Sequence, residues 1–208
     1  MERFEVLAVI RKEKAYGVRK ALSEKGIPYV CWNVKGRGKE GGLRYRGLFK
    51  DRVLMPFLPK TAFCLWTDPE SYKFVVDTFI NVAHTGAYGD GKIFVLNNSG
   101  GSGMKIVKAI IRPEKVFEVA RSLEKKGIKA MTVWDVFGRG REGGVQVGDV
   151  VYDELAKTMI MIAVEDSDVN KVVDTIIKTA HSGAYGDGKI FVLEVGEVWT
   201  IRTKERGL

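Results

Sequence analysis

The sequence predicts an α+β protein made of two tandem domains of the same kind. Segment 86–96 recurs unchanged at 183–193, each time as a Gly-Asp-Gly-Lys loop followed by an apolar run. The likeness extends through both halves, since the Gly-Arg-Gly at 36–38 recurs at 138–140. The chain has 208 residues, of which 45% are hydrophobic, and this is enough for two small domains with a core each.

The predicted boundary between the domains is a polar Gly/Ser segment at 98–103. This segment contains no apolar residue, and Met104 follows it directly. Such a composition is typical of a flexible linker, here one that joins two separately encoded proteins artificially. We therefore expect a first domain over 1–97, a linker over 98–103 and a second domain over 104–208.

Within the first copy, apolar periodicity predicts each element in order. β-Branched and apolar runs predict four strands, at 4–11, 29–35, 61–67 and 93–96. Helical spacing predicts two helices, at 13–25 and 70–83, the first ended by Gly26. The residues expected to face the core are Ala15, Val18, Ala21 and Leu22 in the first helix, and Tyr72, Val75, Val76, Phe79 and Ile80 in the second.

The order of these elements, βαββαβ, is that of a ferredoxin-like fold, and the second copy repeats it. Residues 36–60 form a long stretch between the second and third strands, rich in Gly and Arg, that we expect to be irregular. Loops of this length are usually functional or disordered. Between Gly138 and Gly183 the corresponding loop is shorter than between Gly36 and Gly86.

Composition limits the class of protein. The formal net charge of +8 favours anionic partners such as nucleotides, acidic metabolites or nucleic acid. Cys31 and Cys64 match no disulfide or zinc pattern, and both lie in apolar runs where a buried, reduced thiol is expected. No apolar stretch approaches the ~18 residues of a membrane span, and the N-terminus does not resemble a signal peptide. We expect a cytoplasmic protein.

The repeated Gly-Asp-Gly-Lys loop has the chemistry of a phosphate site. Glycines allow backbone N–H groups to approach phosphate oxygens, and Lys92 and Lys189 each add a positive charge. A simple turn between helix and strand would explain the glycines, but it would not explain the repeated lysine. A P-loop is excluded because Ile93 stands where a P-loop has Ser or Thr, and because this loop leads into a strand.

Other conspicuous residues indicate no catalysis. His84 and His181 precede the two loops without a carboxylate at triad spacing, so we interpret them as helix-end caps. No set of nucleophile, base and orienting residue occurs, and we do not predict an enzyme. Four tryptophans in strand-like segments are expected in the core or in interfaces, namely Trp32, Trp66, Trp134 and Trp199.

Each copy resembles the PII family of nitrogen-regulatory signal proteins. The resemblance lies in Val34-Lys-Gly-Arg-Gly-Lys-Glu-Gly41, in Phe57-Leu-Pro-Lys60, in Thr85-Gly-Ala-Tyr-Gly-Asp-Gly-Lys-Ile-Phe-Val95 and in the closing Thr200-Ile-Arg-Thr-Lys-Glu-Arg-Gly207. It covers nearly the whole chain apart from the linker. The second copy is most similar to one member of the archaeal PII pair that regulates nitrogenase, and the first copy to its partner.

The resemblance implies the following biochemistry. PII proteins are trimers of ferredoxin-like domains that bind ATP or ADP between subunits, and most sense 2-oxoglutarate. A long loop, the T-loop, docks onto a target; here it would span about 37–59 and, shortened, about 139–156. The implied nucleotide-binding residues are Gly38, Lys39, Gly89, Asp90, Gly91, Lys92, Gly140, Arg141, Gly186, Asp187, Gly188, Lys189 and Arg202. The implied effector-binding residues are Glu40, Lys60, Glu142 and Lys157.

Two departures from the family pattern concern the effector and loop modification. Glu40 and Glu142 stand where many members have a Gln that helps to hold Mg²⁺ and 2-oxoglutarate. A carboxylate can ligate Mg²⁺ but repels a dianionic acid, so sensing of 2-oxoglutarate stays open at this point. Lys50 stands at the position of the tyrosine that is often uridylylated, which argues against control by that modification.

A third departure concerns the basic tail, which in the family holds phosphates from the neighbouring subunit. The second copy keeps Arg202 but has Thr200 in place of another arginine, and the first copy ends at Leu96–Asn97 without a tail. The first-copy cleft should therefore bind nucleotide poorly unless the second copy supplies its tail. The two copies would then be unequal sensors.

Three functions remain at this point. The leading hypothesis is an allosteric sensor in a homo-oligomer of PII-type rings, which binds adenine nucleotide and controls a nitrogen-metabolism target, nitrogenase first and an ammonium channel second. A PII-fold trimeric scaffold that has lost its ligands is the alternative. A nucleic-acid binder, suggested by the charge and by the basic and aromatic residues at 44–50, is less favoured.

Overall fold

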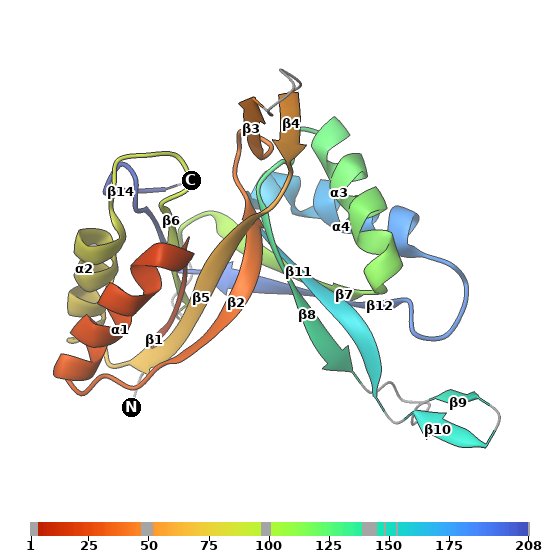
Figure 1. The fold of residues 1–208 in the computed structure, drawn as a ribbon, viewed down its shortest axis with the longest axis horizontal. Coiled ribbons are helices and arrows are strands. Elements are labelled where there is room, and N and C mark those ends of the chain that lie inside the picture. The colour runs from red at the N-terminus through yellow and green to blue at the C-terminus, as the bar shows by residue number, and fades with distance from the viewer. Residues whose placement is uncertain are drawn as a thin grey trace.

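The computed structural model describes residues 4–46, 52–96, 101–138, 145–147, 149–152 and 154–207. The first copy contains two α-helices and a short 3₁₀ turn (Figure 1). Its strands are β1 (Phe4–Arg11), β2 (Val30–Arg37), β3 (Leu43–Arg46), β4 (Arg52–Met55), β5 (Leu58–Thr67) and β6 (Gly91–Leu96), and its helices are η1 (Lys12–Lys14), α1 (Ala15–Glu24) and α2 (Tyr72–Ala83).

The second copy repeats this order and adds a C-terminal extension, which we call the tail (residues 197–207). Its strands are β7 (Met104–Ile111), β8 (Met131–Gly138), β9 (Val145–Val147), β10 (Val150–Tyr152), β11 (Leu155–Glu165) and β12 (Gly188–Val195), and the tail adds β13 (Glu197–Thr200) and β14 (Glu205–Arg206). Its helices are η2 (Pro113–Lys115), α3 (Val116–Lys125), η3 (Asp166–Asp168) and α4 (Val169–Ala180).

Each copy folds as an antiparallel four-stranded sheet with two helices on one face. The strand order is β6-β1-β5-β2 in the first copy and β12-β7-β11-β8 in the second, so the ferredoxin-like prediction is confirmed. The two sheets are continuous, because β2 pairs with β8 over Lys35–Arg37 and Met131–Val133. In Figure 1 the helices lie on the outside of an arch, and the sheets form its inner side.

The apolar spacing of the helices explains how each copy closes its own core. In the first copy, Val18 and Leu22 of α1 and Phe79 of α2 are fully buried against the sheet. The stripe predicted from sequence matches this core, except that Ala21 is half-buried and Tyr72 packs at the edge. Burial of each large apolar side chain contributes about 1.5–3 kcal/mol, so packing rather than helix propensity holds these short helices.

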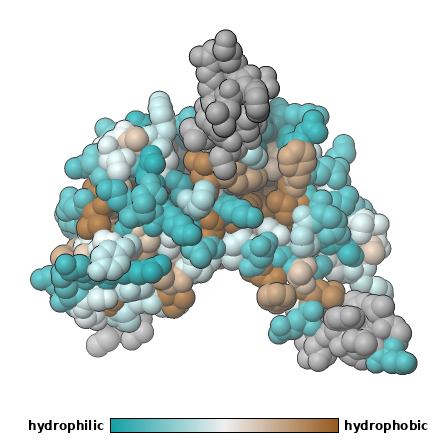
Figure 2. All heavy atoms as spheres, in the orientation of Figure 1, coloured by the Kyte–Doolittle hydropathy of each residue, from teal (hydrophilic) through white to brown (hydrophobic). Residues whose placement is uncertain are grey.

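The opposite faces of the two sheets pack against each other and form a third apolar cluster. This cluster joins residues of both copies, including Val9 and Phe94 of the first copy and Met161 and Val198 of the second. Figure 2 shows hydrophobic residues gathered where the two copies meet, above an open notch between their lower ends. Because β1 is buried on both faces, its sequence is a continuous apolar run rather than an alternating one.

A buried arginine reinforces the junction. Arg37, at the end of β2, is 6% exposed and points into the second copy. Its guanidinium donates to the carbonyls of Lys129 (2.7 Å) and Ala120 (3.2 Å) and to a carboxylate oxygen of Glu124 (3.1 Å). The guanidinium also lies 5.5 Å from the ring centre of Phe57. Burial lowers the pKa of Arg37, while Glu124 opposes that shift.

The stretch that sequence predicts to be irregular contains structure. Strands β3 and β4 pair as a hairpin between residues 43 and 55, and β5 begins at Leu58, three residues before the predicted start at 61. Pairing of β9 with β10 gives the shorter loop of the second copy a hairpin as well. Both hairpins project away from the arch in Figure 1.

The cysteine and tryptophan predictions are partly corrected. Cys64 is buried, and burial together with Glu5 raises its pKa to about 12, whereas Cys31 is only half-buried. Trp32 and Trp134 face each other across the junction with ring centres 6.0 Å apart. Trp66 is 53% exposed and is not among the residues of the apolar cluster between the sheets. In the part of the chain that the structure describes, no helix is long and apolar enough to cross a membrane.

Candidate functional site

The Gly-Asp-Gly-Lys loop connects α2 to β6 and needs its glycines for steric reasons. Gly91 has φ +123°, and a Cβ at this position would lie 2.0 Å from the carbonyl oxygen of Val9. Gly188 has the same conformation, with φ +129° and 1.9 Å to the carbonyl oxygen of Ile110. The backbone therefore enters the strand in a form that only glycine adopts.

A buried carboxylate fixes the shape of the loop. Asp90 accepts hydrogen bonds from the backbone N–H groups of Thr85 (2.7 Å) and Gly86 (2.9 Å) and from the hydroxyl of Thr85. Burial alone would raise the pKa of Asp90, but these hydrogen bonds and the Arg11 guanidinium hold it below its ordinary value. In the second copy, hydrogen bonds from Ser182 lower the pKa of Asp187 in the same way.

This geometry changes the interpretation of the two aspartates. The sequence analysis groups Asp90 and Asp187 with the nucleotide-binding residues. Their carboxylates are engaged by backbone N–H groups inside the loop, so what they fix is the shape of the loop backbone.

In each copy, an arginine and a lysine also hold the loop through its backbone carbonyls. The lysines were among the residues singled out from sequence, but the arginines were not. Arg11 donates to the carbonyl of Tyr88 (2.5 Å), and Lys60 donates to the carbonyl of Gly89. Arg112 and Lys157 make the same contacts in the second copy, to Tyr185 (2.6 Å) and Gly186 (2.5 Å). The sequence does contain a sign of the two arginines, because an Ile-Arg pair ends the first strand of each copy. Nothing in the sequence, however, distinguishes this pair from the rest of the repeat.

These contacts also bear on the expected effector lysines. Burial lowers the pKa of Lys60, and the neighbouring Arg11 adds to that shift. Burial and Arg112 lower the pKa of Lys157. Each ammonium group already has a carbonyl partner in the loop, so each lysine links the beginning of a strand, β5 or β11, to the Gly-rich loop.

The first-copy loop borders a cavity of about 430 Å³ at the junction of the two copies. The cavity brings together the predicted residues Gly38, Lys39, Glu40 and Lys60 with the loop residues 89–92. The second copy supplies one side of the cavity. It is lined by Ala130, which precedes β8, by Met131 and Thr132 of β8, and by Met161 and Ala163 of β11.

The third side of the cavity is the tail. Strand β13 pairs antiparallel with β6, which places Thr200 opposite Lys92. The Lys92 ammonium donates to the Thr200 hydroxyl (2.6 Å), and the Arg202 guanidinium lies 4.8 Å from the ring centre of Tyr88. The second copy thus supplies the tail that the first copy lacks, the condition on which the sequence analysis made first-copy binding depend.

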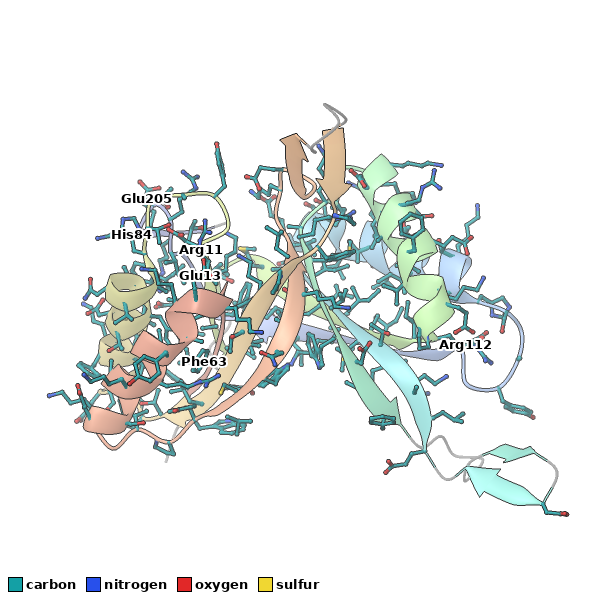
Figure 3. The ribbon with its side chains drawn as sticks, in the orientation of Figure 1. Arg11, Glu13, Phe63, His84, Arg112 and Glu205 are labelled. Carbon is teal, nitrogen blue, oxygen red and sulfur yellow. The ribbon has the colours of Figure 1, made fainter. Side chains whose placement is uncertain are left out.

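The end of helix α2 meets the same tail. His84 caps α2, as predicted, and its Nδ1 lies 3.0 Å from the carbonyl oxygen of Ile201, which is fully buried. In Figure 3, Arg11, His84 and Glu205 of the tail are all seen in the half of the arch that the first copy forms, whereas Arg112 is seen in the other half. The two loops therefore stand in different surroundings.

Positive charge accumulates in the first-copy cavity. Burial lowers the pKa of Lys92 to about 8, and repulsion from Lys39 and Arg202 contributes to that shift. Three cationic side chains thus converge where the glycine loop opens. This arrangement is unfavourable without an anion and becomes favourable when a polyanion enters.

The second-copy loop is more open. Lys189 is exposed whereas Lys92 is half-buried, and Tyr185 is 84% exposed against 68% for Tyr88; in the described part of the chain, neither Lys189 nor Tyr185 has a partner like Thr200 or Arg202 of the tail. The predicted residues Gly140, Arg141 and Glu142 lie outside the described residues. Within the described ranges, no group of three His, Cys, Asp or Glu side chains could hold a metal ion by itself.

Comparison with known proteins agrees with the geometry. The family model "Nitrogen regulatory protein P-II" matches residues 3–99 and again 104–205. A nifHD region glnB-like protein 1 of Methanococcus maripaludis is 47% identical over 50% of this chain and 100% of its own length. A nifHD2 region GlnB-like protein 1 of Methanosarcina barkeri is 52% identical over the same shares.

Further similar proteins carry the family name itself. "Nitrogen regulatory protein P-II 2" of Methanothermobacter thermautotrophicus is 51% identical over 50% of this chain and 94% of its own length. The crystal structure of Arabidopsis thaliana PII bound to citrate is 39% identical, covers 51% of this chain and 88% of its own, and has a TM-score of 0.44. The two matches to the family model together cover nearly the whole chain. The chain therefore belongs to the nitrogen regulatory protein P-II family, as a tandem pair of PII domains.

Proposed function

We propose that this PII protein binds ATP or ADP in the cavity between its two copies and reports the bound state through its T-loops. The observation that carries the proposal is the convergence of Lys39, Lys92 and Arg202 beside a glycine loop with an internally engaged aspartate. A triphosphate or diphosphate supplies the negative charge that this cluster lacks. Backbone N–H groups of the loop add hydrogen bonds to the phosphate oxygens.

The apolar side of the cavity suits a nucleobase. Val9 and Phe94 of the first copy and Met161 and Ala163 of the second line it. A planar ring gains dispersion contacts and apolar burial there, while the phosphates point toward the cations. Family membership favours adenine as the base.

Mg²⁺ and 2-oxoglutarate are proposed as secondary ligands. Glu40 lines the cavity and offers a carboxylate oxygen, a ligand that Mg²⁺ accepts alongside substrate phosphates. Lys60 lies beside it, but its ammonium already donates to Gly89. We therefore expect 2-oxoglutarate to bind only after the nucleotide and the metal. In the second copy, Glu142 and Lys157 are the corresponding proposed residues.

The proposed output is regulatory rather than catalytic. Lys60 and Lys157 link each Gly-rich loop to the root of a T-loop, so a ligand that binds one loop conformation more tightly shifts the T-loop population. The relatives are named for nif regions, so we propose nitrogenase as the first target and an ammonium channel as the second. Nucleic acid is not favoured. We place the protein in the cytoplasm, where free ATP and ADP are available.

We also propose a homo-oligomer built from PII-type rings. Phe191 and Val192 of β12 are 50% and 46% exposed, and β12 is the edge of the sheet. In the first copy, the counterpart strand β6 is covered by the other copy. A PII domain of a second chain is the natural cover, because it would continue the interface that the two copies already form.

Calorimetric titration tests the proposed function directly. The full chain is titrated with ATP and with ADP in the presence of Mg²⁺, and ATP titrations are repeated with 2-oxoglutarate. We expect saturable binding that Lys92→Ala weakens at least tenfold and that Lys20→Ala, a change at an exposed helix position, leaves unchanged. A wild-type chain that releases or takes up no heat with either nucleotide at several temperatures would support the scaffold alternative instead.

A further inference from the structure

The same six residues have different surroundings in the two copies. Strands β6 and β12 both begin Gly-Lys-Ile-Phe-Val-Leu. Phe94 is 4% exposed in β6, whereas its counterpart Phe191 is 50% exposed in β12. Val95 is fully buried, whereas Val192 is 46% exposed. Since the sequences are identical, the difference comes from what packs against each strand.

The difference arises because the chain has two loops and one tail. After β12 the chain continues through Gly196 into β13, which crosses to β6 and pairs with it. After β6 the chain runs through the linker into β7, so the first copy has no residues left for such an extension. The single tail is used on the first copy.

The tail changes the chemistry of the loop that it covers. It brings Thr200 to the Lys92 ammonium and Arg202 over Tyr88, and it closes one side of the cavity. Lys189 and Tyr185, at the same positions of the second loop, are exposed and have no such partner among the described residues. Among the described residues, the second loop lacks the cover of the tail and its Arg202 guanidinium, so a phosphate there stays in contact with water.

From this asymmetry we infer that the two like loops are unequal, so that each chain holds one tightly bound nucleotide, at Lys92, and the loop at Lys189 is not a comparable site. The inference rests on the proposed function and adds how many nucleotides each chain binds tightly and at which loop. A neighbouring chain that covers β12 leaves the inequality intact, because its own tail is already paired with its own first copy. Loss of one charge-assisted contact and of enclosure corresponds to at least about tenfold weaker binding.

A matched pair of substitutions tests the inference. ATP is titrated into the wild-type chain, Lys92→Ala and Lys189→Ala, with Mg²⁺ present throughout. We expect one tight site per chain in the wild type, loss of that site in Lys92→Ala, and less than a threefold change of its affinity in Lys189→Ala. Arg202→Ala should weaken the same tight site about tenfold or more, because only the tail of the second copy carries this guanidinium.

Photolabelling with 8-azido-ATP locates the nucleotide without relying on substitutions. Because the azide is on the base, label is sought beside the apolar wall that follows each loop: trypsin places Phe94 in residues 93–105 and its counterpart Phe191 in residues 190–202, and mass spectrometry tells these two peptides apart. We expect label at subsaturating nucleotide in the first peptide and at least tenfold less in the second. This measurement also decides the question if Lys92→Ala does not fold.

The outcomes separate the inference from the proposed function. If the wild type binds no ATP, the proposed function fails. If it binds ATP at two sites of equal affinity, or if Lys189→Ala costs as much as Lys92→Ala, or if both peptides are labelled equally, only the inequality fails. With a folded protein, each result therefore supports or overturns either the proposed function or the inequality of the two loops.

Discussion

Lys92 shows how a single residue acquires its role from its surroundings. It has the same sequence neighbours as Lys189, but burial, Lys39 and Arg202 lower its pKa to about 8. A bound phosphate favours the protonated form of Lys92 and raises its pKa again. Protonation of this lysine and binding of nucleotide are therefore linked.

The linkage predicts a pH dependence of binding. Below about pH 8, Lys92 is already protonated in the free chain, whereas above it the ligand must bind together with a proton. ATP affinity should fall about tenfold between pH 7.5 and pH 9, with proton uptake visible as a buffer-dependent heat. Lys92→Arg, which stays charged, should keep its affinity over this range. Equal pH profiles for the wild-type chain and Lys92→Arg would contradict the assignment.

At this scale, the sequence predicts residue types better than their contacts. The glycines and lysines of the loop are recognisable from their spacing, because a phosphate site needs a flexible backbone and positive charge. The inward turn of Asp90 and the support from Arg11 are not predictable in this way. Asp90 turns toward near neighbours, Thr85 and Gly86, but residue types alone do not show that its carboxylate faces them, and Arg11 is 79 residues away in the sequence.

Among the elements, β2 has two tasks. It is a central strand of its own copy, and its last residues pair with β8 of the other copy. Arg37 at its end hydrogen-bonds two carbonyls of the second copy, and the β3–β4 hairpin follows it in the chain. The base of this hairpin is therefore tied to the junction between the copies.

Removal of this arginine should destabilise the chain. Arg37→Met leaves the carbonyl of Ala120, which is buried, and that of Lys129, which is partly buried, without their donor, and this should lower the free energy of unfolding by about 2–4 kcal/mol. Urea unfolding followed by circular dichroism measures this loss. Arg19→Met, at an exposed position of α1, is the control and should change it by less than about 0.5 kcal/mol. An equal effect of the two substitutions would show that Arg37 does not stabilise the junction.

The elements themselves were mostly predictable. Apolar runs and helical spacing locate the main strands and helices to within a few residues, because each buries a periodic face. The hairpins β3–β4 and β9–β10 were not predicted. Their strands are short and lie among glycines and charged residues, so the loop-like composition of the surrounding sequence conceals them.

For the whole molecule, the decisive feature is that the two copies share one sheet and one apolar cluster. Sequence predicts both domains and the boundary, and it raises the question of the tail. It does not determine which surfaces of the copies meet, because the residues on both sides are equally apolar. The destination of the tail follows from that packing.

The proposed ring predicts that the exposed edge holds chains together. Phe191→Asp places a charge on β12 and should convert the assembly to single chains of 23.2 kDa, as measured by light scattering after size-exclusion chromatography. Phe117→Asp changes another exposed phenylalanine, 64% exposed on α3 against 50% for Phe191, and should leave the mass of the assembly unchanged. A wild-type chain that is itself a 23.2 kDa monomer at micromolar concentration would rule out this mode of association.

The tail that closes the first cleft belongs to the same polypeptide as the cleft. Its effective concentration at that site is set by the covalent connection, on the order of millimolar, and does not change when the protein is diluted. A cleft completed by a separate subunit opens as soon as the subunits part. In this chain, the ability to hold a nucleotide at Lys92 should therefore persist at protein concentrations far below those at which any larger assembly survives.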